Sequence, residues 1–292
     1  MERLEADVVF SCGEDSYLPD ADVWLVIDVL RATTVIARWF ELGGTELYPV
    51  KTPDDARALV QELRERGSSP LLMGEVNGLP PDGFDLGNSP TELSYELIQE
   101  HYCGVMSTTN GTVALTQAAS SGSMVLAVCL RNYAACLDYA LTRGKRIGLL
   151  CSGRKRRPSW EDTLCAGAVL AEMCTRGEVW MTDSANIALT LWQNRGDSLT
   201  DCVKKSNHAQ YLEQIGFGED IAFCCECDAS TVVPMLVTES GKNILRSVSG
   251  NARPYPRAHG TIATEARITP PEPEVVRRAD PFEELLSYTR KK

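Results

Sequence analysis

The chain has 292 residues, of which 43% are hydrophobic and 24% are charged, and its net charge is −11. This is the composition of a globular protein, and the negative charge argues against nucleic acid as the main partner, because phosphate backbones are bound by basic faces. No apolar run approaches the roughly 20 residues that cross a bilayer and the first residues do not form a signal peptide, so we expect no membrane partner and a cytoplasmic location.

Short apolar runs alternate with helical patterns along the chain. We expect strands over residues 24–29, 46–50, 71–74, 105–108, 124–128 and 147–151, and helices over 33–42, 53–66, 91–99, 113–119, 133–141 and 163–174. This alternation predicts an α/β fold, with a layered, largely parallel or mixed sheet flanked by helices. The pattern leaves open an arrangement of two similar packed α/β halves.

The composition changes near residue 241, where Pro and Arg become frequent and apolar periodicity is lost. We therefore expect one α/β domain over residues 1–240 and a loosely ordered extension over residues 241–292. Ligands of parallel sheets bind beyond the carboxyl ends of the strands. The polar segments that follow the apolar runs are thus the candidates for a functional site.

The first such segment follows the strand expected to end near residue 28. Asp28 suits a metal ligand or a nucleophile, and the planar fork of Arg31 suits an anionic oxygen. Thr33 and Thr34 place hydroxyl and amide groups at a helix N-terminus, where anions are favoured. The alternative is an ordinary helix cap, since Asp and Thr are both capping residues.

The second segment follows the strand over residues 71–74. Glu75 and Asp85 are candidate metal ligands or acid–base groups in a loop rich in Gly and Asn. The alternative is a surface loop in which Ser89 caps a helix that has Pro90 at its first position.

The third segment is Thr108-Thr109-Asn110-Gly111-Thr112, which joins a strand to the next helix. Its hydroxyl, amide and backbone N–H groups at a helix start are suited to hold a phosphate. It is not a Walker loop, because it has no Gly-Lys-Ser/Thr sequence. A strong helix cap is again the alternative.

The fourth segment follows the strand over residues 147–151. Gly153 and Arg154 come at the strand end, where Arg154 is a reasonable anion contact. Ser159 and Asp162 have the spacing of a capping box, so Asp162 is either a functional carboxylate or part of a helix start. The basic run over residues 154–157 is otherwise a solvated loop.

Two common phosphatase mechanisms fit the sequence poorly. An aspartyl nucleophile of the haloacid-dehalogenase type needs a second Asp two residues after Asp28, and Leu30 is there instead. Cys151 and Arg157 have the Cys-x5-Arg spacing, but the surrounding loop lacks the other features of a cysteine phosphatase. The eleven Cys residues are scattered and read as reduced core thiols, and no second Cys or His pair completes a zinc site with Cys224 and Cys227.

The four segments in this order resemble the 2-phosphosulfolactate phosphatase family (ComB-like). The resemblance extends to about residue 237 and includes the late Phe217 and Asp220, whereas the basic loop over residues 154–158 and the extension depart from the family pattern. It rests on the following stretches: 27–34, Gly74-Glu75, 83–90, 108–112, and Glu161-Asp162 before Ala166-Gly167-Ala168.

The resemblance implies an enzyme, a phosphoric monoester hydrolase that uses Mg²⁺ to convert 2-phospho-3-sulfolactate to 3-sulfolactate and phosphate. In some organisms this is a step of coenzyme M biosynthesis. The partner is then a small anionic phosphorylated substrate. Two alternatives are a phosphatase of another small phosphorylated hydroxy acid and a non-catalytic anion-binding protein on the same scaffold.

On this hypothesis each candidate residue has a role. The catalytic residues are Asp28, Arg31, Glu75 and Asp162, of which the three carboxylates hold the metal. The substrate or anion is bound by Thr33, Thr34, Asn88, Thr108, Thr109, Asn110, Gly111, Thr112, Gly153 and Arg154.

The sequence leaves several points open. It does not decide between attack by water and a phosphorylated Asp28 intermediate, and assembly into a homo-oligomer stays open. The histidines His101, His208 and His259 have no recognisable catalytic context, so we assign them no role.

Overall fold

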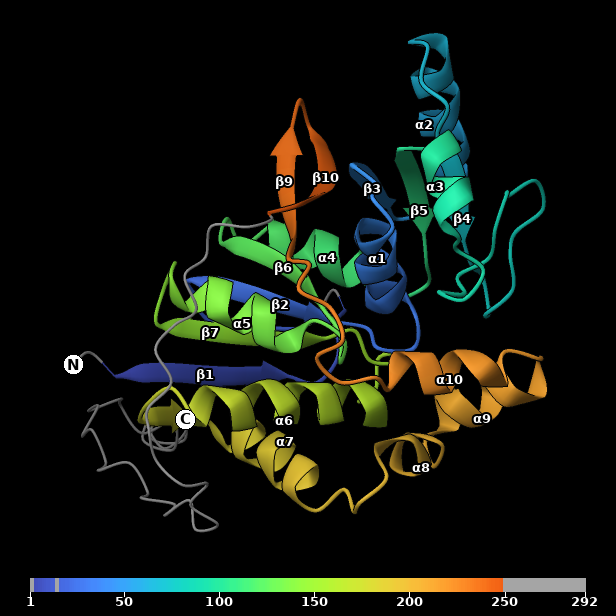
Figure 1. Cartoon of the computed structure of the whole chain (residues 1–292). Coiled ribbons are helices and arrows are strands. Elements are labelled where there is room, and N and C mark those ends of the chain that lie inside the picture. The colour runs from blue at the N-terminus through green and yellow to red at the C-terminus, as the bar shows by residue number, and fades with distance from the viewer. Residues whose placement is uncertain (1–2, 14–15, 249–292) are drawn as a thin grey trace, which may run out of the picture. The chain divides into compact units, whose positions relative to one another are not determined.

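The computed structural model describes residues 3–13 and 16–248. In these residues ten strands form one mixed sheet in the order β4-β5-β3-β10-β9-β6-β2-β7-β1-β8 (Figure 1). The strands are β1 (Leu4–Val9), β2 (Val23–Ile27), β3 (Glu46–Val50), β4 (Leu71–Gly74), β5 (Cys103–Ser107), β6 (Met124–Val128), β7 (Arg146–Cys151), β8 (Val179–Met181), β9 (Pro234–Glu239) and β10 (Lys242–Ser247). The helices are α1 (Ala32–Glu41), α2 (Pro53–Glu65), α3 (Tyr95–Glu100), α4 (Gly111–Ala119), α5 (Tyr133–Leu141), α6 (Trp160–Cys174), α7 (Asp183–Gln193), α8 (Leu199–Val203), α9 (Asn207–Gln214) and α10 (Gly218–Cys224).

The sheet contains two parallel blocks joined by an antiparallel hairpin. Strands β4, β5 and β3 are parallel, and so are β6, β2, β7, β1 and β8. The hairpin β9–β10 pairs antiparallel with β6 on one side and β3 on the other. The predicted α/β fold with a mixed sheet is confirmed, and the two parallel blocks belong to one hydrogen-bonded sheet.

The hairpin corrects the predicted domain boundary. Ser240 and Gly241 form its two-residue loop, and both have positive φ angles, of 50° and 76°. A two-residue turn in which both residues have positive φ has a backbone twist that matches the right-handed twist of the flanking strands. Lys242–Ser247, placed in the extension by the sequence analysis, therefore form β10 inside the sheet, and residues 249–292 lie outside the described residues.

Strand β2 shows why the chain forms a layered fold. All five of its residues are buried, as expected for a parallel strand covered on both faces. Because side chains alternate along a strand, Trp24 and Val26 pack into the core on one face, and Leu25 and Ile27 into the core on the other. Its carboxyl end is thereby fixed at a buried point, and Asp28 follows there.

The elements between α6 and residue 248 were not predicted individually, and they include a helical segment beside the strand ends. In Figure 1, α9 and α10 lie next to the loop that follows β4, and the Tyr211 hydroxyl on α9 donates to the Asn77 carbonyl at 2.8 Å. Among the described residues, none of the helices combines the length and the apolar character that crossing a bilayer would require.

Candidate active site

A cavity of 490 Å³ lies where the loops after β2, β4, β5 and β7 meet helix α9. The four polar segments thus converge in space. Eight of the predicted site residues line it, namely Asp28, Arg31, Glu75, Asn88, Thr108, Thr109, Asn110 and Arg154. The predicted residues outside this lining are Thr33, Thr34, Gly111, Thr112, Gly153 and Asp162.

Asp28 is a buried carboxyl group at the end of β2. Its backbone is fixed by Thr33, whose Oγ1 accepts from the Asp28 amide at 3.0 Å and donates to the Asp28 carbonyl at 2.8 Å. Burial raises the pKa of Asp28 well above its usual range, and the charges of Asp162, Glu75 and Glu161 act in the same direction. Such a carboxyl group either holds a proton or requires a nearby cation.

The threonine hydroxyls at the start of α1 organise the loop instead of facing the cavity. Thr33 bonds to the Asp28 backbone, and Thr34 Oγ1 donates to the Val29 carbonyl at 2.8 Å. Both residues are fully buried. Because their hydroxyls already have backbone partners, the structure does not favour anion binding by Thr33 and Thr34. They do not cap α1 either, since its N-cap residue, Arg31, has no side-chain cap hydrogen bond.

Arg31 lines the cavity, but its guanidinium is bound to protein groups. Nη1 donates to Asp220 Oδ2 at 2.9 Å, Nη2 donates to the Gly78 carbonyl at 2.8 Å, and the group stacks on Phe217 with 4.4 Å to the ring centre. Both side chains of the Arg31–Asp220 pair are 2% exposed. Arg31 therefore holds α10 and the loop after β4 against the site, a role that the sequence alone did not show.

Asp220 gathers two further groups from the loop before α3. Its Oδ1 accepts from Ser89 Oγ at 2.6 Å and from Thr91 Oγ1 at 2.9 Å. The expected helix start at Ser89 and Pro90 is wrong, because α3 begins at Tyr95 with Ser94 as its cap. The Ser89 hydroxyl donates a hydrogen bond to the Asp220 carboxylate instead of capping a helix.

Glu75 joins two of the loops that form the cavity. Its Oε2 accepts from the Gly78 amide at 2.6 Å and its Oε1 accepts from the Thr109 amide at 2.7 Å. The partly exposed carboxylate thus ties the loop after β4 to the loop after β5. Asp85, the other carboxylate considered in this region, accepts from the Leu72 amide at 2.8 Å and does not line the cavity.

The loop before α4 combines internal hydrogen bonds with an anion-binding position. Thr108 Oγ1 accepts from the Thr112 amide at 3.1 Å, and Thr112 Oγ1 donates to the Thr108 carbonyl at 2.9 Å, whereas the N-cap residue Asn110 makes no side-chain cap hydrogen bond. Thr109 and Asn110 line the cavity at the N-terminal end of α4, where the helix dipole favours negative charge. Gly111 approaches Asp28 so closely that a Cβ there would lie 2.8 Å from Asp28 Oδ2.

Asp162 lies behind the cavity and fastens two strand ends together. Its Oδ1 accepts from the Val29 amide at 2.9 Å and its Oδ2 accepts from the Gly153 amide at 3.1 Å. Burial, followed by the charge of Glu161, raises the pKa of Asp162 to about 7. Ser159 accepts from the Asp162 amide at 3.3 Å, so the predicted capping of α6 by Ser159 is confirmed.

The three carboxylates predicted to share a metal do not form one cluster. Within residues 3–13 and 16–248, no group of three or more His, Cys, Asp or Glu side chains is placed to hold a metal ion. Asp162 uses both of its oxygens for backbone amides and does not line the cavity, whereas Asp28 lines it together with Asn88, whose Oδ1 is buried without a hydrogen-bond partner. Asp28 and Asn88 therefore supply oxygen donors to the cavity.

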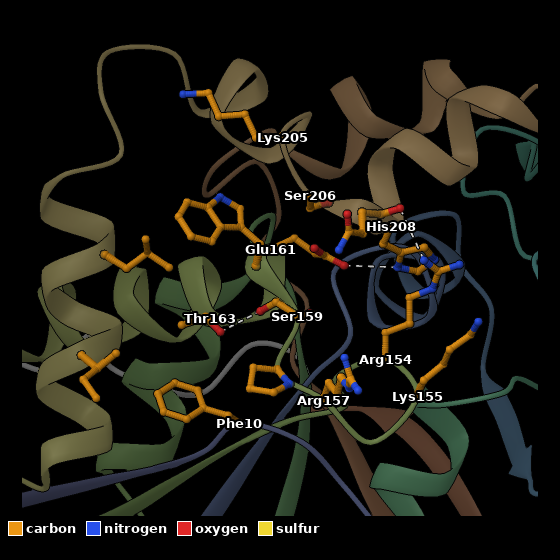
Figure 2. Close-up of a pocket in the computed structure, with 15 residues that line it drawn as sticks. Phe10, Arg154, Lys155, Arg157, Ser159, Glu161, Thr163, Lys205, Ser206 and His208 are labelled. Carbon is orange, nitrogen blue, oxygen red and sulfur yellow. Dashed lines mark hydrogen bonds and ion pairs between the residues drawn. The ribbon is translucent and has the colours of Figure 1, made fainter.

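His208 and Glu161 belong to the site although no role was assigned to His208 from the sequence. His208 lines the cavity, and its Nδ1 is 3.1 Å from Glu161 Oε1. Figure 2 shows this contact in the wall of a neighbouring cavity of 830 Å³, which shares Arg154, Lys155, Asn207 and His208 with the first. An isolated His in a helical segment carries no local signal of this pairing.

The cysteine alternative is excluded by burial. Cys151 is fully buried, and burial raises the pKa of its thiol well above the usual value, so it is not an available nucleophile. All eleven Cys residues are free thiols, but the expected core position holds for eight of them, since Cys103 is half-buried and Cys174 and Cys227 are exposed. Cys224 and Cys227 take part in no metal-binding group of the described residues.

Comparison with known proteins gives one family for most of the described fold. Residues 13–239 match the family model described as 2-phosphosulpholactate phosphatase. A probable 2-phosphosulfolactate phosphatase of Pseudothermotoga lettingae is 35% identical over 218 residues, which is 74% of this chain and 90% of the relative. Proteins with the same description from Deinococcus radiodurans (36% over 236 residues, 80% and 93%) and Thermus thermophilus (35% over 244 residues, 83% and 98%) are also similar.

Proposed function

The chain belongs to the 2-phosphosulpholactate phosphatase family, and from this premise we propose that it hydrolyses 2-phospho-3-sulfolactate to 3-sulfolactate and phosphate. The observation that carries the proposal is the cavity at the strand ends, where a buried carboxyl group faces a helix N-terminus and cationic side chains. The substrate presents a phosphate, a sulfonate and a carboxylate on three carbons, so it needs several anion-binding groups close together.

The cavity offers such groups on different walls. Thr109 and Asn110 lie at the N-terminus of α4, which suits a phosphoryl group. Arg154, whose guanidinium stacks on Tyr211 with 4.8 Å to the ring centre, and Lys155 approach from the loop after β7 and suit the other anions. In a protein with a net charge of −11, anion binding is in this way confined to one place.

Magnesium is the cofactor we propose, and the residues present fit it. Mg²⁺ is bound through one or two carboxylates together with substrate phosphates, and Asp28 with the unpartnered Asn88 Oδ1 supplies two oxygen donors at the cavity. A cation there would offset the raised pKa of Asp28 and neutralise phosphoryl oxygens. Asp28 is then an ionised carboxylate beside the reacting phosphoryl group, either as the nucleophile or as the group that orients water.

The test is phosphate release by the purified protein from 2-phosphosulfolactate, phospholactate and phosphoglycolate, each with and without Mg²⁺. We expect metal-dependent release that is fastest with the sulfonate-bearing substrate, because anion-binding groups left unpaired by the smaller substrates lower the rate. Asp28→Ala should abolish turnover with folding intact, whereas Asp197→Ala, at an exposed position, should not. If no phosphate is released from any of the three substrates in the presence of Mg²⁺, the proposal is contradicted.

Location and partners are part of the same proposal. A cytoplasmic location is supported by eleven free thiols, eight of which are buried. The partner is a small phosphorylated anion, as the family description implies.

A further inference from the structure

His208 is held in the wall of the site cavity by a buried carboxylate. Its Nδ1 lies 3.1 Å from Glu161 Oε1, and the Glu161 residue is only 1% exposed (Figure 2). The pair is an ion pair when the His208 ring is protonated, and the side chain of Glu161 is then 2% exposed beside a cationic ring that is 18% exposed. Because a carboxylate oxygen only accepts, the ring donates from Nδ1 and Nε2 is left to exchange a proton.

The proposed reaction needs a proton at one particular atom. When the phosphorus–oxygen bond of an alkyl phosphate breaks, the ester oxygen keeps the bonding electron pair and would leave as an unstable alkoxide. A positioned acid that protonates this oxygen accelerates such a step by about 10²–10⁴-fold. The anion-binding groups and Asp28 hold the substrate and act on phosphorus, and none of them protonates the leaving oxygen.

Few of the described residues that line the cavity have a proton to give. Glu75 accepts two backbone amides, Tyr211 donates its hydroxyl proton to the Asn77 carbonyl, and an arginine such as Arg154 does not release a proton in proteins. Lys155 is on an exposed loop, so nothing fixes the position of its amine. His208, fixed by Glu161, is the positioned acid that remains once Asp28 is assigned to the attacking side.

We propose that His208 donates the proton to the leaving oxygen of the phosphate ester and that Glu161 is the positioning residue that orients its ring. This inference rests on the proposed function. The imidazolium gives its Nε2 proton to the ester oxygen as the phosphorus–oxygen bond breaks. Water supplies the hydroxyl group that ends on phosphorus, and the proton that water loses restores the imidazolium, so that ester and water give alcohol and hydrogen phosphate.

The experiment compares leaving groups in the full-length protein. Steady-state rates are measured with 2-phosphosulfolactate, whose alkoxide needs a proton, and with p-nitrophenyl phosphate, whose phenolate leaves without one. We expect His208→Gln to lower kcat for 2-phosphosulfolactate by about 10²–10⁴-fold, with little change in KM and a much smaller effect on p-nitrophenyl phosphate. Glu161→Gln should lower kcat in the same substrate-selective way by a smaller factor, and Glu161→Asp should recover part of it.

Controls separate chemistry from folding. His101→Gln replaces a histidine that bonds to Ser69 outside the cavity and should leave both rates unchanged, and circular dichroism and urea unfolding check each variant. A solvent deuterium isotope effect on kcat/KM for 2-phosphosulfolactate, present in the wild type and lost in His208→Gln, gives a second readout that needs no aryl substrate.

Each other outcome overturns the inference in a distinct way. Equal losses on both substrates would make His208 a binding or structural residue, and full alkyl-ester activity in His208→Gln would remove it from the reaction. A wild-type protein that releases no phosphate from 2-phosphosulfolactate would overturn the proposed function itself, and with it this role of His208.

Discussion

Replacing Gly111 by Ala tests whether the approach of α4 to Asp28 is required for activity. A Cβ at this position would lie 2.5 Å from the Ala32 Cβ and 2.8 Å from Asp28 Oδ2. Carbon atoms pack best at about 3.5–4.0 Å, so the new methyl group is about 1 Å too close to Ala32. Ala32 is fixed in α1, and therefore either α4 or the Asp28 carboxyl group must move.

The close contacts of the new methyl group set the expected losses of stability and of activity. Overpacking a tight site costs about 1–3 kcal/mol, and the better helix propensity of Ala returns up to about 1 kcal/mol, so we expect a net loss of about 1–2 kcal/mol in the free energy of unfolding. A displacement of about 1 Å at a reacting group costs on the order of 10²-fold in rate. Activity should thus fall much further than stability.

The assay is phosphate release from 2-phosphosulfolactate with Mg²⁺, beside unfolding in urea. Gly218→Ala is the matched control, because a Cβ at the first residue of α10 meets the flexible Glu213 side chain at 3.3 Å. We expect it to keep the wild-type rate and a stability within about 0.5 kcal/mol. A Gly111→Ala protein with wild-type kcat/KM would refute the reasoning, since Asp28 would then tolerate displacement.

Three further predictions concern the carboxylates around the site. Because the pKa of Asp162 is raised to about 7, its contribution to stability is full below about pH 4 and is lost as pH rises through about 7. Urea unfolding should therefore give a lower free energy of unfolding at about pH 8 than at about pH 5. Asp162→Asn should reduce this difference between the two pH values, and an unchanged difference would show that Asp162 does not cause it. Asp220→Ala leaves Arg31 buried without its partner and should cost about 3–5 kcal/mol in the free energy of unfolding, whereas a loss below about 1 kcal/mol would show that the pair is not isolated from water. Treatment with a chelator should abolish phosphate release and Mg²⁺ should restore it in the wild type but not in Asp28→Asn; full activity without any divalent cation would exclude the proposed cofactor.

The α/β fold and the place of the site could be predicted because both depend on local pattern. Buried parallel strands such as β2 read as continuous apolar runs, and the rule that ligands bind beyond the carboxyl ends of strands singled out Asp28, Glu75 and Arg154 without any tertiary information. The cap of α6 by Ser159 could likewise be predicted, because a helix start depends on residues that are three or four positions apart.

The partners of these residues were decided by tertiary structure. Arg31 looks like a ligand for an anion until its guanidinium is found on Asp220, 189 positions along the chain. His208 acquires a role only through Glu161, 47 positions away, and Lys242–Ser247 become part of the sheet only because β9 offers them a strand to pair with. Local pattern showed which strand ends carry polar groups. Whether each group faces a ligand or another part of the protein depended on packing, because a buried polar atom bonds to whichever partner the fold brings within reach, and no local periodicity records that choice.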